Sequence, residues 1–177
     1  MKITCPNCKR RFKVTMCRAI TCKCGNEISG IDLFHGEPIY IADANIYWYS
    51  KNRDERRGKA CTIALSQENV VFTDTVLNEI GRNSKVNVIK ARKISKEVRE
   101  TRTNRLKQPS EVDLSIVQTA IDNPCVVGII TYDKDFMNIA TVGTIREHSI
   151  KNAPAFWIGD AKAFLEKQGI WKKNGGK

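Results

Sequence analysis

The chain has 177 residues, 41% of them hydrophobic, and it carries 30 Lys and Arg against 19 Asp and Glu, a formal charge of +11. This length accommodates one core domain of about 130 to 150 residues and a small appendage. No apolar run is as long as a membrane span, and the first residues lack a signal peptide's hydrophobic segment, so we expect a cytoplasmic protein without membrane contact. The charge favours nucleic acid as a partner, although excess charge can also serve solubility alone.

Two close pairs of cysteines lie at the start of the chain. Cys5 and Cys8 form a C-x-x-C pair, and Cys22 and Cys24 form a C-x-C pair. In a reducing compartment this spacing indicates a metal site, because four thiolates from two tight turns can surround one ion and stabilise a segment too small for its own core. The pattern resembles a zinc ribbon. We therefore expect residues 1–33 to be a small β-hairpin domain with a structural Zn²⁺.

The ligand set has one open alternative. Cys17 lies near the second pair and is an alternative zinc ligand to one of its members. Cys24 is preferred because Gly25 follows it directly, as a tight metal-binding turn needs. The alternative for the whole cluster is four buried free cysteines.

Residues 34–37 are expected to link the ribbon to a second domain, residues 38–177. Short apolar runs predict strands at 38–42, 86–89 and 126–130, with only a strand stub at 70–72 and further apolar stretches near 139–142 and 155–158. Helical spacing predicts helices at 44–53, 59–68, 74–80, 110–121 and 160–168. The first of these should bury residues 46–49, and Asp74 should cap the third. This alternation predicts an α/β fold with a central parallel sheet flanked by helices.

Acidic side chains follow two of the expected strands. Asp43 ends the first strand, and Asp133 and Asp135 follow the strand in VVGIITYDKDF. The carboxyl edge of an open parallel sheet is where ligands bind, and helices that start or end there can add Glu79 and Asp113. Converging carboxylates hold protons at neutral pH unless cations compensate them. We therefore expect one or two Mg²⁺ or Mn²⁺ ions, which prefer oxygen ligands.

Asp113 also has a purely structural interpretation. Ser110 is expected to cap the helix that follows it, and Asp113 lies three residues later in the capping-box position. A carboxylate there stabilises a helix N-terminus whether or not it takes part in chemistry.

From residue 38 onward the chain resembles a PIN domain, a family of metal-dependent nucleases that act mostly on RNA. Four segments carry the resemblance in order: IADAN, TDTVLNEI, SEVDLSIVQTA and TYDKDF. The resemblance implies a PIN-like sheet, paired protomers and water-mediated hydrolysis of RNA phosphodiester bonds with metal assistance. It implies metal-binding catalytic acids and two supporting polar residues: Asp43, Glu79, Asp113, Asp133 and Asp135, with Asn45 and Thr131. Residues 82–108 match none of the family's segments.

Two basic segments are candidates for RNA contact. They are Arg10, Arg11, Phe12 and Lys13 in the ribbon, and Lys90, Arg92, Lys93, Arg102 and Arg105 before the third acidic segment. The alternative for the second segment is a solvated helix face, and the alternative for the ribbon is docking of a protein partner.

These patterns favour a metal-dependent endoribonuclease, with three rivals. The first is a catalytically inactive RNA-binding or ribonucleoprotein-binding module. The acids argue against it, because all four matched acidic positions are filled. The second is a structure-specific DNA nuclease, which usually carries helical insertions that this chain is too short to hold. The third is a toxin ribonuclease restrained by a partner protein.

Overall fold

The computed structural model describes residues 2–5, 7–13, 20–25, 27–28, 38–52, 55–82, 84–100, 109–123, 125–134, 136 and 156–171. The predicted linker at 34–37 and the apolar stretch at 139–142 lie outside these ranges. None of the described helices combines the length and apolar character that crossing a bilayer requires.

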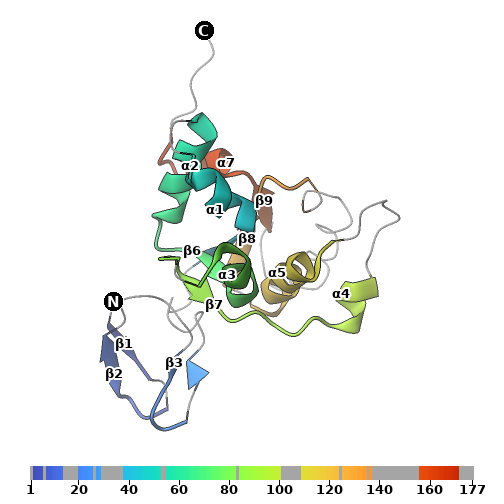
Figure 1. The fold of residues 1–177 in the computed structure, drawn as a ribbon. Helices are drawn as coiled ribbons and strands as arrows, with labels where there is room; N and C mark the ends of the chain where they lie inside the picture. Colours follow the sequence, from blue (N-terminus) through green and yellow to red (C-terminus); the bar gives the residue numbers. More distant parts are fainter. Residues whose placement is uncertain are drawn as a thin grey trace.

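A five-stranded parallel sheet forms the larger part of the molecule (Figure 1). Its spatial order is β7-β6-β5-β8-β9, so the chain builds outward from β5 to β7 and then adds β8 and β9 on the other side of β5. The strands are β5 (Ile39–Ala42), β6 (Val70–Thr73), β7 (Val88–Ile89), β8 (Val126–Ile130) and β9 (Trp157–Gly159). The predicted parallel α/β sheet is confirmed. Val70–Thr73 is more than the stub expected from its length, because all four residues are buried and it pairs on both sides.

Helices connect and flank the strands (Figure 1). Between β5 and β6 lie α1 (Ala44–Ser50) and α2 (Arg56–Leu65), and between β6 and β7 lies α3 (Asp74–Ile80). The chain reaches β8 through α4 (Lys96–Glu100) and α5 (Glu111–Asp122), and α7 (Ala161–Lys167) follows β9. Helices α1, α2 and α7 pack together, while α5 contacts α3, α4, β6 and β8.

Three local predictions were wrong. Trp48 was expected on the buried face of α1 but is 55% exposed, whereas Ile46 is fully buried. Thr73 rather than Asp74 caps α3: its Oγ1 accepts the N–H of Val76, and Asp74 instead accepts the N–H of Ala91 after β7. Helix α2 begins at Arg56 rather than at residue 59.

The centre of the sheet is packed by aromatic rings. Tyr40 on β5 meets Phe164 of α7 edge-on at 4.9 Å between centroids and Trp157 of β9 at 5.9 Å. Gly128 of β8 lies against these groups, and a Cβ there would stand 2.6 Å from the Trp157 carbonyl oxygen. This close approach requires the glycine in the VVGII strand and fixes β8 against β5 and β9.

The N-terminal residues form two small antiparallel hairpins. In the first, β1 (Lys2–Thr4) pairs with β2 (Arg11–Lys13), and in the second, β3 (Ile20–Thr21) pairs with β4 (Glu27–Ile28). Each hairpin encloses one pair of cysteines in its turn.

Candidate functional site

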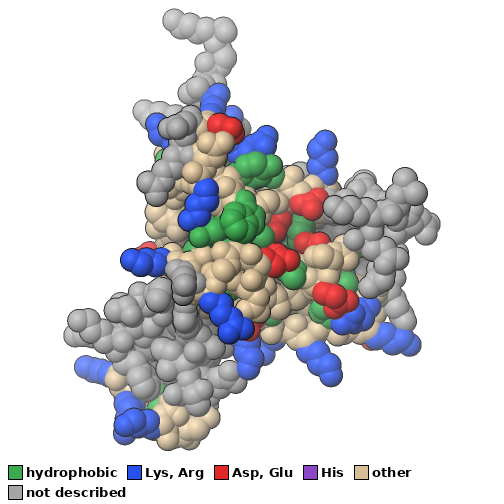
Figure 2. All heavy atoms as spheres, viewed as in Figure 1, with side chains coloured by type: hydrophobic (Ala, Val, Ile, Leu, Met, Phe, Trp, Pro, Cys, Tyr) green, Lys and Arg blue, Asp and Glu red, His purple; other side chains and the backbone are tan. Residues whose placement is uncertain are grey.

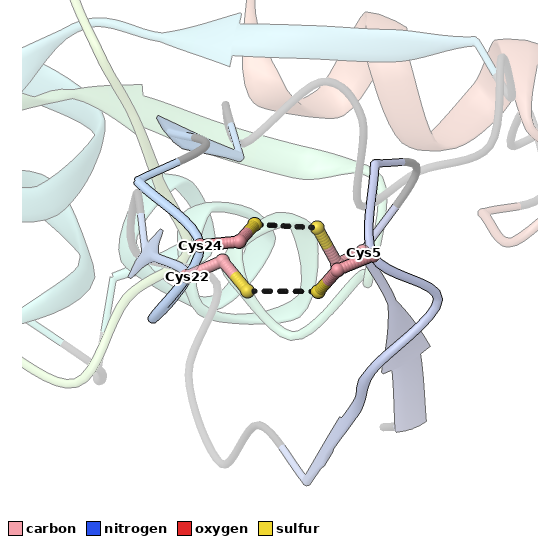
Figure 3. Close-up of side chains that lie close together, drawn as sticks. Cys5, Cys22 and Cys24 are labelled. Atoms are coloured by element: carbon pink, nitrogen blue, oxygen red, sulfur yellow. Dashed lines mark hydrogen bonds between the residues drawn. The ribbon is translucent and has the colours of Figure 1, made fainter.

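The four N-terminal cysteines converge from the two hairpin turns (Figure 3). The Sγ atoms of Cys5 and Cys24 are 3.8 Å apart, those of Cys8 and Cys22 are 3.4 Å apart, and all four lie within 4.8 Å of one another. Tetrahedral Zn–S bonds of about 2.3 Å place sulfur atoms about 3.8 Å apart. The cluster can therefore hold a metal ion such as zinc. Cys24 belongs to it, whereas Cys17 lies outside the described residues.

Backbone N–H groups in the two turns favour the thiolate form of the cysteines that they contact. The N–H groups of Cys8 and Asn7 lower the pKa of Cys5 to about 6, which favours the thiolate that a metal ion needs. At Cys22 the N–H of Cys24 acts in the same direction, but burial and neighbouring sulfurs prevail and raise its pKa to about 12. Gly25, directly after the second pair, adopts a positive φ of 82°, as expected for a tight turn.

A second candidate site centres on Asp43, at the junction of β5 and α1. Asp43 is only 7% exposed, and its Oδ2 accepts hydrogen bonds from Asn45 Nδ2 at 2.5 Å and from Thr131 Oγ1 at 2.7 Å. Asn45 Nδ2 also lies 3.1 Å from Thr131 Oγ1. These bonds join the carboxyl end of β5 to the carboxyl end of β8.

The turn after β8 folds against the same group. The N–H of Asp133 donates to Thr131 Oγ1 at 2.9 Å, and the N–H of Tyr132 donates to Asn45 Oδ1 at 3.2 Å. Strand β5 is the point from which the chain builds the sheet in both directions, so the carboxyl ends of β5 and β8 flank the topological switch point. Ligands of open α/β sheets bind in the crevice at such a point.

Electrostatic coupling connects further acids to Asp43. Burial raises the pKa of Asp43 to about 6; the Thr131 hydrogen bond opposes this, and the charges of Asp113 and Asp133 add to it. The pKa of Glu79 on α3 is also raised, by burial and then by Asp113. Asp113 therefore acts on both carboxyls. Figure 2 shows acidic side chains gathered between β9, α3 and α5, with basic side chains around them.

Asp113 is held by the predicted capping box. Its Oδ2 accepts the N–H of Ser110 at 2.8 Å, and its own N–H donates to Ser110 Oγ at 3.1 Å. The structural interpretation of this residue is therefore confirmed. It places the carboxylate at the N-terminal turn of α5.

The acids are more loosely gathered than the thiols. Among the described His, Cys, Asp and Glu residues, only the four cysteines bring at least three ligand atoms within reach of one ion. Asp43, Asn45 and Thr131 are in direct contact, Asp133 is joined to Thr131 through its backbone, and Asp113 and Glu79 are connected through charge. Asp135 lies outside the described residues.

Sequence reasoning missed a chain of hydroxyl groups beside this edge. Thr75 Oγ1 lies 2.8 Å from Thr73 Oγ1 and 2.7 Å from Ser115 Oγ, which donates to the carbonyl of Val112. These hydrogen bonds connect the start of α3 to the first turns of α5 and so help to position Asp113. The only signal was that all three hydroxyls lie within the acidic segments TDTVLNEI and SEVDLSIVQTA.

The candidate RNA-binding residues lie on separate segments. Arg10 and Arg11 are exposed in the first hairpin, and Phe12 and Lys13 follow on β2. Lys90, Arg92 and Lys93 are exposed between β7 and α4. Arg92 has a structural role as well, because its Nη2 donates to Asn123 Oδ1 at 3.3 Å. Arg102 and Arg105 lie outside the described residues.

Comparisons with protein-family models, curated proteins and solved structures found no match to this chain. Its functional assignment therefore rests on its own residues. The described residues form one cluster that can hold a metal ion, the four thiols, and separately a buried carboxyl at the edge where open parallel sheets bind ligands, with other acids nearby.

Proposed function

We propose that the chain is a metal-dependent endoribonuclease, with a PIN-like domain at residues 38–177 and a zinc ribbon at residues 1–33. One observation carries the proposal. Asp43 is a buried, hydrogen-bonded carboxyl at the switch point of a parallel sheet, and burial, with a smaller contribution from the charges of Asp113 and Asp133, raises its pKa. Perturbed carboxyls at a ligand-binding edge are typical of functional sites.

The donor set fits a hard divalent cation. Asp43, Glu79, Asp113 and Asp133 offer oxygen ligands, and a cation would relieve the repulsion that raises the pKa of Asp43. Mg²⁺ usually keeps several waters and uses one or two carboxylates together with substrate phosphates, so a loose acidic set suits it better than a closed cage. Bound Mg²⁺ or Mn²⁺ would lower the pKa of a water molecule and neutralise charge on the phosphate.

The surrounding residues have definite tasks in this proposal. Thr131 and Asn45 hold the Asp43 carboxylate in one orientation through Oδ2. The capping box holds Asp113 at the start of α5. The charge of +11 attracts RNA, and the exposed Arg10 and Arg11 of the ribbon add phosphate contacts.

Cleavage assays test this proposal. Labelled single-stranded RNA, structured RNA and DNA are incubated with Mg²⁺, Mn²⁺ or EDTA, comparing the wild type with Asp43→Asn. We expect metal-dependent RNA cleavage that falls by orders of magnitude in the variant, while RNA binding stays similar or tightens because a negative charge is removed. Glu68→Gln, an exposed acid after α2, is the matched control and should keep full activity. Full activity of Asp43→Asn would refute the assignment.

A second candidate function is RNA binding without cleavage. The observation that favours it is the commitment of the Asp113 carboxylate to a capping box, together with the looseness of the acidic set among the described residues. RNA that is bound but never cut, by either protein and with either metal, would establish this function instead.

A further inference from the structure

A concave site adjoins the turn after β8, at the same edge of the sheet. It is a cavity of about 300 Å³ lined by residues of α2, the turn after β8, the start of α7 and the segment after α7: Arg56, Arg57, Ala60, Tyr132, Asp160, Lys162 and Trp171. Tyr132 stands directly between Thr131 and Asp133 in the chain, and its N–H binds Asn45. The cavity therefore adjoins the group that holds Asp43.

The lining of the cavity is suited to an anion. It contains the basic residues Arg56, Arg57 and Lys162 and a single acid, Asp160. Asp160 is committed to capping α7, because its Oδ1 accepts the N–H of Ala163 at 2.8 Å. Lys162 is paired with Glu166 at 3.4 Å, which leaves the two arginines as the main source of positive charge.

Arg57 is held in place by two aromatic rings. Its guanidinium carbon lies 4.8 Å from the centroids of both Tyr49 and Tyr132, and the two rings meet edge-on at 5.1 Å. Because the guanidinium already stacks on two rings, it loses less freedom on binding a phosphate than an unsupported arginine would.

The lining also has an apolar part. The half-buried ring of Trp171 and the methyl group of Ala60 belong to it, beside the Tyr132 ring that Arg57 covers. Aromatic faces stack unpaired bases, and this stacking is tolerant of sequence. A volume of about 300 Å³ lies at the lower end of the range for small-ligand pockets, so the cavity suits a single base and not a duplex.

We propose that this cavity binds one unpaired nucleotide next to the scissile phosphate, with its phosphate on Arg56 and Arg57 and its base against Trp171. The position of this nucleotide relative to cleavage rests on the proposed nuclease function, whereas nucleotide binding by the cavity does not. The nuclease therefore acts on single-stranded segments, because a paired base cannot enter.

Binding measurements in the Asp43→Asn background test the cavity without needing catalysis. The probes are a short single-stranded oligoribonucleotide and a DNA of the same sequence, and the test variant is Arg56→Gln. We expect its affinity to fall on the order of tenfold and the slope of log K against log salt to shrink by about 0.7, the value for one lost phosphate contact on a single strand. Lys59→Gln, on the same helix but outside the cavity, is the matched control and should change neither value beyond its general charge effect.

Trp171 gives a second, independent readout. We expect its fluorescence to be quenched when a base stacks on it. Trp171→Phe should remove that quenching but keep most of the affinity, because a phenyl ring still stacks. Trp171→Ala should weaken binding on the order of tenfold, since it removes the stacking face.

The outcomes separate the two proposals. RNA binding that is unchanged in both Arg56→Gln and Trp171→Ala would overturn the nucleotide site, whatever the cleavage result. Cavity-dependent binding without cleavage by the wild type would overturn the nuclease function and keep the site. Equal losses for RNA and DNA would assign recognition to the shared phosphate and base, whereas a loss confined to RNA would assign it to the 2′-hydroxyl as well.

Discussion

The cysteine cluster and the acidic site both gather metal-ligand side chains, but the chain assembles them in different ways. The cysteines lie in the turns of two small hairpins close in sequence, and their sulfurs converge within 4.8 Å. The acids come from the ends of β5 and β8 and from α3 and α5. The first site depends on local turns, whereas the second depends on the order of strands in a sheet.

Under the proposed function, the difference also matches what each kind of ion requires. A structural zinc site is closed by four protein ligands, so its sulfurs must approach one another closely. A Mg²⁺ site that handles phosphate leaves positions for water and substrate, so its carboxylates stay further apart. Close thiols and more widely spaced acids are therefore compatible with a structural zinc site and with the proposed catalytic Mg²⁺ site.

The largest expected effect comes from breaking the thiol cluster. Cys24→Ser removes one of four ligands, and apparent zinc-binding free energies of about 10 to 16 kcal/mol show how much folding energy such a metal supplies to a small domain. We expect the purified variant to lose its bound zinc, measured by native mass spectrometry, and to lose the NMR signals of the two hairpins. Cys17→Ser is the control and should keep one zinc per chain. The reverse pattern would move the fourth ligand to Cys17.

A smaller effect, of about 3 kcal/mol, is expected at Asp43. Its pKa rises from an ordinary value of 3.8 to about 6, because burial penalises its charge. Between about pH 4 and pH 6 the folded state therefore binds more protons than the unfolded chain, so stability falls as pH rises through this window. Two pKa units correspond to about 3 kcal/mol of stability lost above pH 6.

Asp43→Asn should therefore be more stable than the wild type above pH 6 and should lose this part of the pH dependence. Urea unfolding at a series of pH values measures both effects. Adding Mg²⁺ should stabilise the wild type more than the variant, since only the wild type keeps the charge. Identical pH profiles for the two proteins would show that Asp43 titrates normally.

The sequence predicted those parts of the molecule whose signals are local. The C-x-x-C and C-x-C pairs, the capping box of Ser110 and Asp113, and the strand that ends at Asp43 all depend on neighbouring residues, and the structure contains each of them. The predicted start of α2 at residue 59 was late. Gly58 lies inside the helix, where a Cβ would stand 1.7 Å from the Asn52 carbonyl oxygen.

What the sequence could not predict depends on contacts between distant segments. No local pattern shows that β8 pairs with β5, so the contact of Thr131 with Asp43 became visible only in the folded chain. The hydroxyl chain through Thr75 and Ser115 and the position of Arg57 between two tyrosines are of the same kind. The exposure of Trp48 was missed because a run of aromatic residues was read as one buried face.

The smallest effects distinguish the two roles of Asp113. Ser110→Ala removes the hydroxyl that accepts the Asp113 N–H, and the loss of an N-cap costs about 1 kcal/mol. We expect that loss of stability with nearly unchanged cleavage, because the carboxylate stays at the start of α5. Asp113→Asn keeps an acceptor for the Ser110 N–H, so its stability should change little while cleavage falls strongly. Urea unfolding and single-turnover cleavage of the same RNA measure the two quantities side by side.

This pair of variants tests the comparison between the two sites directly. If Asp113 only caps the helix, Ser110→Ala should lose stability, Asp113→Asn should change stability little, and neither should lose the chemical step. If it also holds a cation, Asp113→Asn should lower cleavage far more than its effect on folding explains, and raising the Mn²⁺ concentration should restore part of the activity, since one ligand of a loose oxygen site is weakened and not the whole site. The thiolate cluster should not recover from the loss of one ligand in this way, because all four of its ligands are needed to close the tetrahedral site.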